Sequence, residues 1–180
     1  MSAGAVHLRR LFFALWPDEA LRSALHRETR ARVRHCGGKP VPAANLHLTL
    51  AFLGNVPDER LDAVRTAAGA LGAPRLLLTL DRYGWFDAAQ VLWIGCSESP
   101  APLRQLAAEL GHLMAEVAGL NTDLRPFHPH VTLARKVRNP PELRPPRPVE
   151  WPVSGFALVE SVTDPAGAKY EVLENFGASA

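Results

Sequence analysis

Cysteine is scarce in this 180-residue sequence, which contains only Cys36 and Cys96 and no CxxC spacing. A disulfide framework is therefore excluded, and zinc or redox sites built on paired cysteines are not indicated. Long apolar runs are also missing. The run at residues 11–16 is far shorter than the roughly 20 residues that cross a bilayer, and it is too short for a signal peptide. We expect a cytoplasmic protein without membrane contact.

Charge of one sign is not in excess either. Lys and Arg number 20, Asp and Glu number 18, and the net charge is +2. No strong positive field attracts nucleic acid without regard to its sequence or structure, so any contact with RNA or DNA must be local. With 47% hydrophobic residues, 13 Gly and 16 Pro, the chain is neither disordered nor collagen-like. The length predicts one globular domain over residues 1–180.

Motifs of several common enzyme classes are absent. The sequence has no Gly-x-Ser-x-Gly, so serine hydrolase chemistry has weak support. It also has no Walker A sequence and no Gly-x-Gly-x-x-Gly, so binding of ATP or a dinucleotide is not indicated.

Hydrophobic periodicity predicts a mixture of strands and helices. Helices are expected to begin at residues 17–18, 57–58 and 99–100, and the last of them carries an apolar stripe that should end near Gly119. Strands are expected around residues 11–16, 46–53, 76–83, 91–96, 130–134, 156–162 and 170–173. Several strands follow one another without an intervening helix, which favours an α+β fold with antiparallel pairing.

The proline-rich stretch from Pro140 to Pro152 leaves two interpretations open. Its composition is typical of a solvated connector with a polyproline-like backbone, which we favour. Arg138, Arg144 and Arg147 lie in or beside it, and they could instead form a rim that binds RNA.

One short pattern occurs twice. Residues 45–50 read Asn-Leu-His-Leu-Thr-Leu and residues 128–133 read His-Pro-His-Val-Thr-Leu, so each half of the chain contains His-x-Thr-Leu. Side chains two residues apart lie on the same face of a strand. His47 and Thr49 therefore share one face, as do His130 and Thr132, and the opposite faces are aliphatic and anchor the strands in a core. The repeat predicts two facing lobes with the polar pairs between them.

These residue types suit phosphodiester hydrolysis. A histidine near its unperturbed pKa of roughly 6.5 can give or take a proton, and threonine hydroxyls can donate hydrogen bonds to anionic oxygens. For one His-x-Thr sequence alone, an isolated strand histidine would be the better interpretation. Two copies with matching faces favour an acid and base pair formed by His47 and His130.

A metal site is the nearest chemical competitor. Catalytic zinc usually takes three protein ligands, and neither motif has a carboxylate within two residues of its histidine. His128 could be a further ligand, but it precedes Pro129, so we expect a turn residue there. We predict that no metal is bound.

The chain resembles the two-histidine phosphoesterase superfamily, and within it the RNA 2′,3′-cyclic phosphodiesterases, also called 2′-5′ RNA ligases. The resemblance spans about residues 9–173. It rests on the two histidine motifs, with support from Arg10-Leu-Phe-Phe-Ala-Leu15, Asn45-Leu-His-Leu-Thr-Leu-Ala-Phe-Leu-Gly54, Pro129-His-Val-Thr-Leu-Ala-Arg135, Leu158-Val-Glu-Ser-Val162 and Tyr170-Glu-Val-Leu173.

This resemblance implies a bilobal fold of two antiparallel sheets, with helices outside, a central cleft, and one His-x-Thr strand from each lobe. It implies hydrolysis of the 2′,3′-cyclic phosphate ends of RNA or nucleotides to 2′-phosphomonoesters, with reversible 2′-5′ ligation as an associated activity and no metal or nucleotide cofactor. His47 would be the proton donor and His130 the acceptor, while Thr49 and Thr132 would bind the phosphate. We expect a monomer.

Two further residues are candidates for substrate binding. Arg135 matches a family arginine associated with the site, although an ideal strand would turn it to the other face, so its role requires a bend or bulge. A base could stack on Phe52, Phe127, Tyr83 or Trp85, although buried core is the default for each of these side chains. Of the four, Phe52 is kept as a candidate for substrate binding. Three alternatives remain: a non-catalytic RNA-end binder, a phosphodiesterase for 2′-5′ linkages, and one for an ADP-ribose cyclic phosphate.

Overall fold

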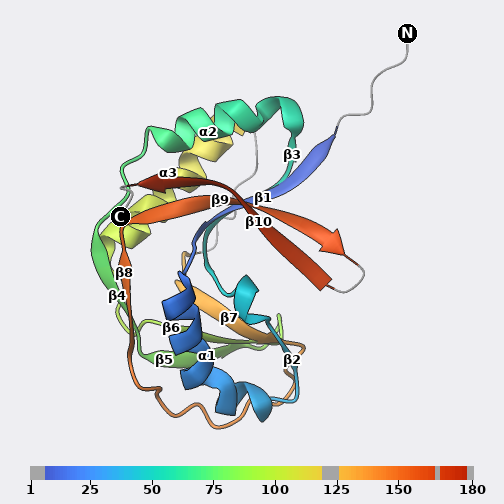
Figure 1. Ribbon diagram of the computed structural model, residues 1–180, viewed down its shortest axis with the longest axis vertical. Coiled ribbons are helices and arrows are strands. Elements are labelled where there is room, and N and C mark those ends of the chain that lie inside the picture. The colour runs from blue at the N-terminus through green and yellow to red at the C-terminus, as the bar shows by residue number, and fades with distance from the viewer. Residues whose placement is uncertain (1–6, 119–125, 165–166, 178–180) are drawn as a thin grey trace.

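A computed structural model describes residues 7–118, 126–164 and 167–177 of the chain (Figure 1). Its helices are α1 (Glu19–Arg34), α2 (Leu61–Gly69) and α3 (Ala101–Ala118), with short 3₁₀ helices at Ala43–Asn45 and Asp58–Arg60. Its strands are β1 (Leu8–Leu15), β2 (Lys39–Pro40), β3 (Leu48–Pro57), β4 (Leu76–Leu80), β5 (Arg82–Phe86), β6 (Val91–Gly95), β7 (His130–Arg135), β8 (Val149–Val153), β9 (Gly155–Asp164) and β10 (Gly167–Gly177).

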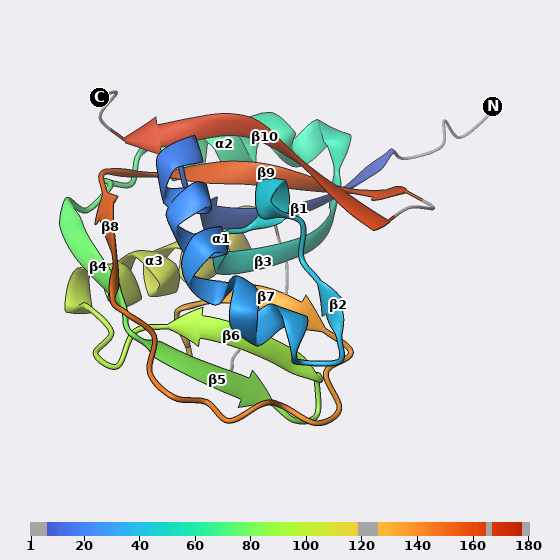
Figure 2. The ribbon, with the colours of Figure 1, turned by 60° about the horizontal axis from the view of Figure 1, so that its bottom comes forward.

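The strands form two antiparallel sheets, which confirms the α+β prediction. The larger sheet has the order β10-β9-β1-β3-β7-β6-β5, with β2 also paired to β7, and the smaller one contains β4 and β8. The resemblance implied one histidine strand from each lobe, and in the structure β3 and β7, which carry the two motifs, both belong to the larger sheet. A single pair, Leu48 opposite Val131, joins them. In Figure 2 the strands on the two sides of this junction form an upper and a lower group, and α1 runs across both. The division into two lobes remains a prediction.

Two of the expected elements differ from the structure. The strand expected over residues 76–83 is divided into β4 and β5 at Asp81, whose carboxylate accepts hydrogen bonds from the backbone N–H and the hydroxyl of Ser97. The connector expected up to Pro152 is wrong at its end, because residues 149–153 form β8. Val149, Trp151 and Val153 are buried at alternate positions there, so a strand period prevails over the proline content.

The predicted helices are confirmed. Asp18 caps α1 by accepting a hydrogen bond from the backbone N–H of Leu21 at 2.8 Å. In the apolar stripe of α3, Leu103, Leu106, Leu110 and Met114 are buried, whereas Leu113 and Val117 are half-buried. The predicted helix end at Gly119 lies outside the described residues. No helix in the described part of the chain combines the length and the apolar character needed to cross a bilayer.

Strand β1 is buried on both faces, which explains its continuous apolar run. Leu11, Phe13 and Leu15 enter the main core, whereas Phe12 and Ala14 join a second cluster with residues of β9 on the opposite face of the sheet. Burying a side chain of this size contributes about 1.5–3 kcal/mol. The second cluster lies beside the first histidine motif, so β1 anchors the region from which that motif projects.

Candidate functional site

The two histidine motifs meet at the junction of β3 and β7. Because the strands are antiparallel and Leu48 pairs with Val131, the register places His47 next to Thr132 and Thr49 next to His130. Each histidine therefore lies opposite the threonine of the other motif, and the two motifs are related by a local two-fold axis. All four line one pocket of about 860 Å³, as the facial pattern predicted.

Both imidazoles are held in the same way. Nδ1 of His47 donates to the carbonyl oxygen of Asn45 at 2.7 Å, and Nδ1 of His130 donates to the carbonyl oxygen of His128 at 2.7 Å. A carbonyl oxygen only accepts, so Nδ1 carries a proton in each ring and Nε2 is the nitrogen that can exchange one. The sequence did not identify the two carbonyl groups, although each lies two residues before its histidine.

The position of His128 agrees with the sequence interpretation, because it precedes β7 and lies outside the strand. Its ring also lines the pocket. Among the described residues, no three His, Cys, Asp or Glu side chains gather into a possible metal site.

Burial keeps both catalytic candidates neutral in the unliganded protein. It lowers the pKa of His47 to about 4, with smaller contributions from the charges of Arg135 and His130, while the bond to the Asn45 carbonyl opposes the shift. Burial also lowers the pKa of His130, and the charges of His128 and Arg135 act in the same direction. Both imidazoles are therefore mainly neutral at pH 7, and His47 resists protonation the more strongly of the two.

Aromatic rings surround His47 on several sides. Trp16 stacks on it with ring centroids 5.6 Å apart and planes 17° apart, and the Phe12 ring lies at 5.0 Å. Tyr170 meets the imidazole edge-on at 5.0 Å. The guanidinium of Arg22 covers the Trp16 ring at 5.6 Å. Sequence reasoning missed these contacts, because they depend on the sheet order β10-β9-β1-β3, which brings distant segments of the chain together.

Phe52 extends this group of aromatic rings toward the pocket. Its ring stacks on Phe12 with centroids 5.5 Å apart, and the guanidinium of Arg10 lies 5.9 Å from it. Phe52 lines the pocket and is 46% exposed, so its ring offers an accessible stacking surface. Register shifts between β1 and β3 accompany this placement, since Phe52 and Thr49 face the same pocket although they are three residues apart.

Of the three other aromatic candidates, one lies at the pocket and two do not. Phe127 lines the pocket. Tyr83 is buried, and its hydroxyl donates to the carbonyl of Glu28. Trp85 donates its indole N–H to the carbonyl of Val137. Neither of these last two is among the described residues that line the pocket.

A bulge brings Arg135 to the pocket. In the pairing of β6 with β7, Trp93 is opposite Thr132 but Leu92 is opposite Ala134, so Leu133 is an extra residue. The extra residue reverses the alternation that follows it, and Arg135 then lies on the same side as Thr132. The structure thus contains the irregularity that a role for Arg135 requires.

The arginines near the proline-rich stretch do not reach this pocket. Arg138, Arg144 and Arg147 are absent from its described lining. Arg144 pairs with Glu142, and the backbone N–H of Arg147 donates to the carboxylate of Glu28 on α1. This arrangement favours the connector interpretation for the part of the stretch that precedes β8.

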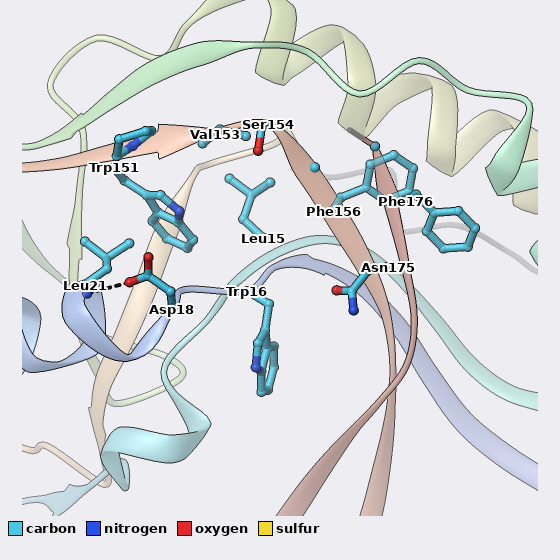
Figure 3. A pocket seen from close by; sticks show the side chains of 13 residues that line it. Leu15, Trp16, Asp18, Leu21, Trp151, Val153, Ser154, Phe156, Asn175 and Phe176 are labelled. Carbon is cyan, nitrogen blue, oxygen red and sulfur yellow. Dashed lines mark hydrogen bonds between the residues drawn. The ribbon is translucent and has the colours of Figure 1, made fainter. Parts of the chain in front are cut away.

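A second, smaller pocket of about 350 Å³ lies near the start of α1 (Figure 3). Trp16, Asp18, Trp151 and Asn175 line it, with backbone and side chains of β8, β9 and β10. Its carboxylate, Asp18, already serves as the cap of α1. The described lining contains no histidine, so the larger pocket is the candidate active site.

Comparisons of sequence and structure relate the chain to known proteins. An RNA 2′,3′-cyclic phosphodiesterase from Escherichia coli is 40% identical over 77% of this chain and 78% of its own length. One from Thermus thermophilus is 39% identical over 93% and 89%. The crystal structure of E. coli LigT complexed with 3′-AMP superposes with a TM-score of 0.89 at 34% identity, covering 97% of this chain and 100% of that one. The family model described as the 2′-5′ RNA ligase superfamily matches residues 17–165. This chain belongs to the 2′-5′ RNA ligase superfamily.

Proposed function

We propose that the chain hydrolyses the 2′,3′-cyclic phosphate ends of RNA or nucleotides to 2′-phosphomonoesters, without a metal or nucleotide cofactor. The observation that carries this proposal is the pair of imidazoles, each anchored through Nδ1 to a backbone carbonyl and each accompanied by a threonine in one pocket. The names of the similar proteins from E. coli and T. thermophilus support the same substrate. The single domain over residues 1–180 and the monomeric state are further parts of the proposal.

The two histidines would have opposite roles in the reaction. Nε2 of His130 takes a proton from water, the water oxygen attacks phosphorus, and the bond from phosphorus to the 3′ oxygen breaks. His47 gives a proton to that 3′ oxygen, so the products are a 3′-hydroxyl and a 2′-phosphate. If a 5′-hydroxyl replaces water as the attacking group, the same steps join two RNA ends through a 2′-5′ linkage.

Binding of the substrate would raise the pKa of His47, so that this residue can act as the proton donor. A proton donor must begin the reaction protonated, yet burial holds the pKa of His47 at about 4 in the unliganded protein. A bound phosphate anion favours imidazolium and raises that pKa. Thr49, Thr132 and Arg135 would hold the phosphate oxygens, and Phe52 would stack on the terminal base.

The first test is turnover of a 2′,3′-cyclic mononucleotide in EDTA, with the position of the product phosphate determined by NMR. His47→Gln and His130→Gln should each lower kcat about 10²-fold to 10⁴-fold, the usual contribution of one general acid or base. His26→Gln is the matched control, because His26 is exposed on α1 and does not line the pocket. It should retain full activity.

Other outcomes would contradict the proposal in distinguishable ways. Loss of activity with EDTA, or a 3′-phosphate product, would exclude this reaction. Tight binding of cyclic-ended RNA without turnover would identify a non-catalytic binder. Turnover restricted to 2′-5′ linkages or to an ADP-ribose cyclic phosphate in a substrate panel would identify one of the related phosphodiesterases.

A further inference from the structure

The pocket extends from the histidines to α3, which packs against β3. Five residues of this helix line the pocket, and their spacing places them on one face beside the buried stripe: Arg104, Ala107, Ala108, Gly111 and His112. Three of the five are Ala or Gly. A Cβ atom built on Gly111 would meet no atom within 4 Å, so the space above this part of the helix is open.

The charge of the described lining favours an anionic ligand at more than one point. It contains two arginines and four histidines and no Asp or Glu. Arg135 lines the pocket near the two histidines, whereas Arg104 lies on α3, where one of its donors bonds to the carbonyl of Ser99. A guanidinium has five N–H donors, so the bond to Ser99 leaves other donors that can bind a phosphate.

His112 lies two turns from Arg104, a rise of about 12 Å along the helix. It is 80% exposed, and its Nε2 is 3.4 Å from a carboxylate oxygen of Glu116, which is not part of the described lining. That carboxylate weakens the attraction of His112 for an anion. Arg104 is therefore the stronger cationic group on this face.

We propose that Arg104 forms a second anion subsite that binds a phosphodiester on the 5′ side of the cyclic end. This proposal rests on the proposed function. A nucleotide with a 2′,3′-cyclic phosphate has both of those oxygens engaged, so its chain can continue only through the 5′ oxygen. The preferred substrate is then an oligonucleotide, whose next phosphate lies against α3 while the cyclic end lies between the histidines.

The test compares a cyclic mononucleotide with cyclic-ended oligonucleotides of two and four nucleotides that share the same terminal base. The longer substrates should have a kcat/KM at least 10-fold higher. Arg104→Gln should remove most of that advantage. Its effect on kcat/KM for the mononucleotide should be at least 10-fold smaller than its effect on kcat/KM for the oligonucleotides. For the oligonucleotides it should also reduce the slope of log kcat/KM against log salt by about 0.7, the share of one phosphate contact on a single strand.

Two further variants complete the design. Gly111→Leu fills the open space on α3 and should lower oligonucleotide turnover much more than mononucleotide turnover; leucine is also a better helix former, so folding is not endangered. Arg30→Gln removes an exposed arginine on α1, outside the described pocket lining. It should change kcat/KM for neither the mononucleotide nor the oligonucleotides.

Equal rates for all chain lengths, or a length advantage that survives in Arg104→Gln, would overturn the subsite. If no cyclic phosphate is hydrolysed at all, the proposed function fails. The subsite is then tested by equilibrium binding of a 2′-phosphate-ended tetranucleotide. Equal affinity of the parent protein and Arg104→Gln in that measurement would overturn it as well.

Discussion

At the scale of single residues, the two motifs differ in the surroundings of their histidines. His47 is enclosed by Phe12, Trp16 and Tyr170, whereas His130 lies near Phe86 and Trp93. The rings around His47 bury it, and this burial lowers its pKa to about 4. Equivalent sequence positions therefore do not have equivalent proton affinities.

This difference predicts the pH profile. In the free enzyme both relevant pKa values lie below 6.5, so kcat/KM should follow a bell with its maximum on the acid side of pH 6.5. Bound phosphate stabilises imidazolium, so the alkaline limb of kcat should lie at higher pH than that of kcat/KM. Steady-state kinetics from pH 4 to 9 with a cyclic mononucleotide measure both limbs.

Variants assign the two limbs of the bell to residues. If His47 is the donor, His47→Gln should remove the alkaline limb while the acidic limb survives in the residual activity. Loss of the acidic limb instead would reverse the two roles. A rate that is flat over the whole range would exclude paired acid and base catalysis.

The residues of the site were partly predictable from the sequence. The two-residue spacing of His47 and Thr49, and its repetition at His130 and Thr132, placed each pair on one face because strand geometry alone determines that. The stacking of Trp16 on His47 was not predictable. It depends on where β1 ends and α1 begins relative to a strand that follows more than 30 residues later.

At the scale of secondary-structure elements, bulges determine what reaches the pocket. Leu133 is the extra residue of β7, and without it Arg135 would face the core side. A one-residue bulge leaves no mark in composition or hydrophobic period, since Leu133 and Ala134 are both apolar and both buried. From the sequence we could therefore infer that a role for Arg135 requires a bulge, but not that the bulge is present.

The position of the Trp93 ring on β6 depends on the glycine opposite it on β5, Gly84. Gly84 pairs with Trp93, and a Cβ atom on Gly84 would lie 1.9 Å from the Trp93 ring. That ring lies 4.6 Å from His128, whose carbonyl anchors the catalytic candidate His130. The absence of a side chain at Gly84 thus makes room for a ring that supports the second histidine motif.

Gly84→Ala should consequently affect both stability and activity. Displacing the Trp93 ring should lower the free energy of unfolding by about 1–3 kcal/mol, the usual cost of overpacking, and should lower kcat by disturbing His128 and His130. Urea denaturation and turnover of a cyclic mononucleotide measure the two effects. Gly72→Ala is the matched control, because a Cβ there meets nothing within 4 Å. Equal behaviour of the two variants would contradict this account.

At the scale of the whole molecule, composition and element order were sufficient to predict an α+β fold with antiparallel strands. They did not predict which strands share a sheet. The junction of β3 and β7 depends on one residue pair, and β8 arises in a proline-rich stretch whose partner, β4, lies about 70 residues earlier. Such distant pairings are decided by packing of the complete chain rather than by local pattern.

The buried histidine also predicts how the folded state responds to acid. The pKa of His47 is about 4 when folded and roughly 6.5 when unfolded, so between these values the unfolded chain binds a proton that the folded chain does not. The contribution of His47 to stability is fully present above pH 6.5 and is lost as the pH falls to 4. The free energy of unfolding should decrease by about 3 kcal/mol over this range because of His47.

Chemical denaturation at several pH values tests this expectation. The curve for His47→Gln should be flatter than that of the parent protein by about this amount. The lowered pKa of His130 acts in the same direction and remains in both proteins. Parallel curves would show that His47 is not the group responsible.

The single pair between Leu48 and Val131 has a mechanical consequence. His47 and His130 are the immediate neighbours of these two residues, so both imidazoles lie beside the point where the two strand groups are joined. Displacement caused by a rotation grows with distance from its pivot. If the groups rotate about this pair, the distant walls of the pocket on α3 and on the β5–β6 turn separate, while the spacing of the two histidines hardly changes. Such a rotation would widen the entrance for substrates of different bulk while the atoms that transfer protons keep their relative positions.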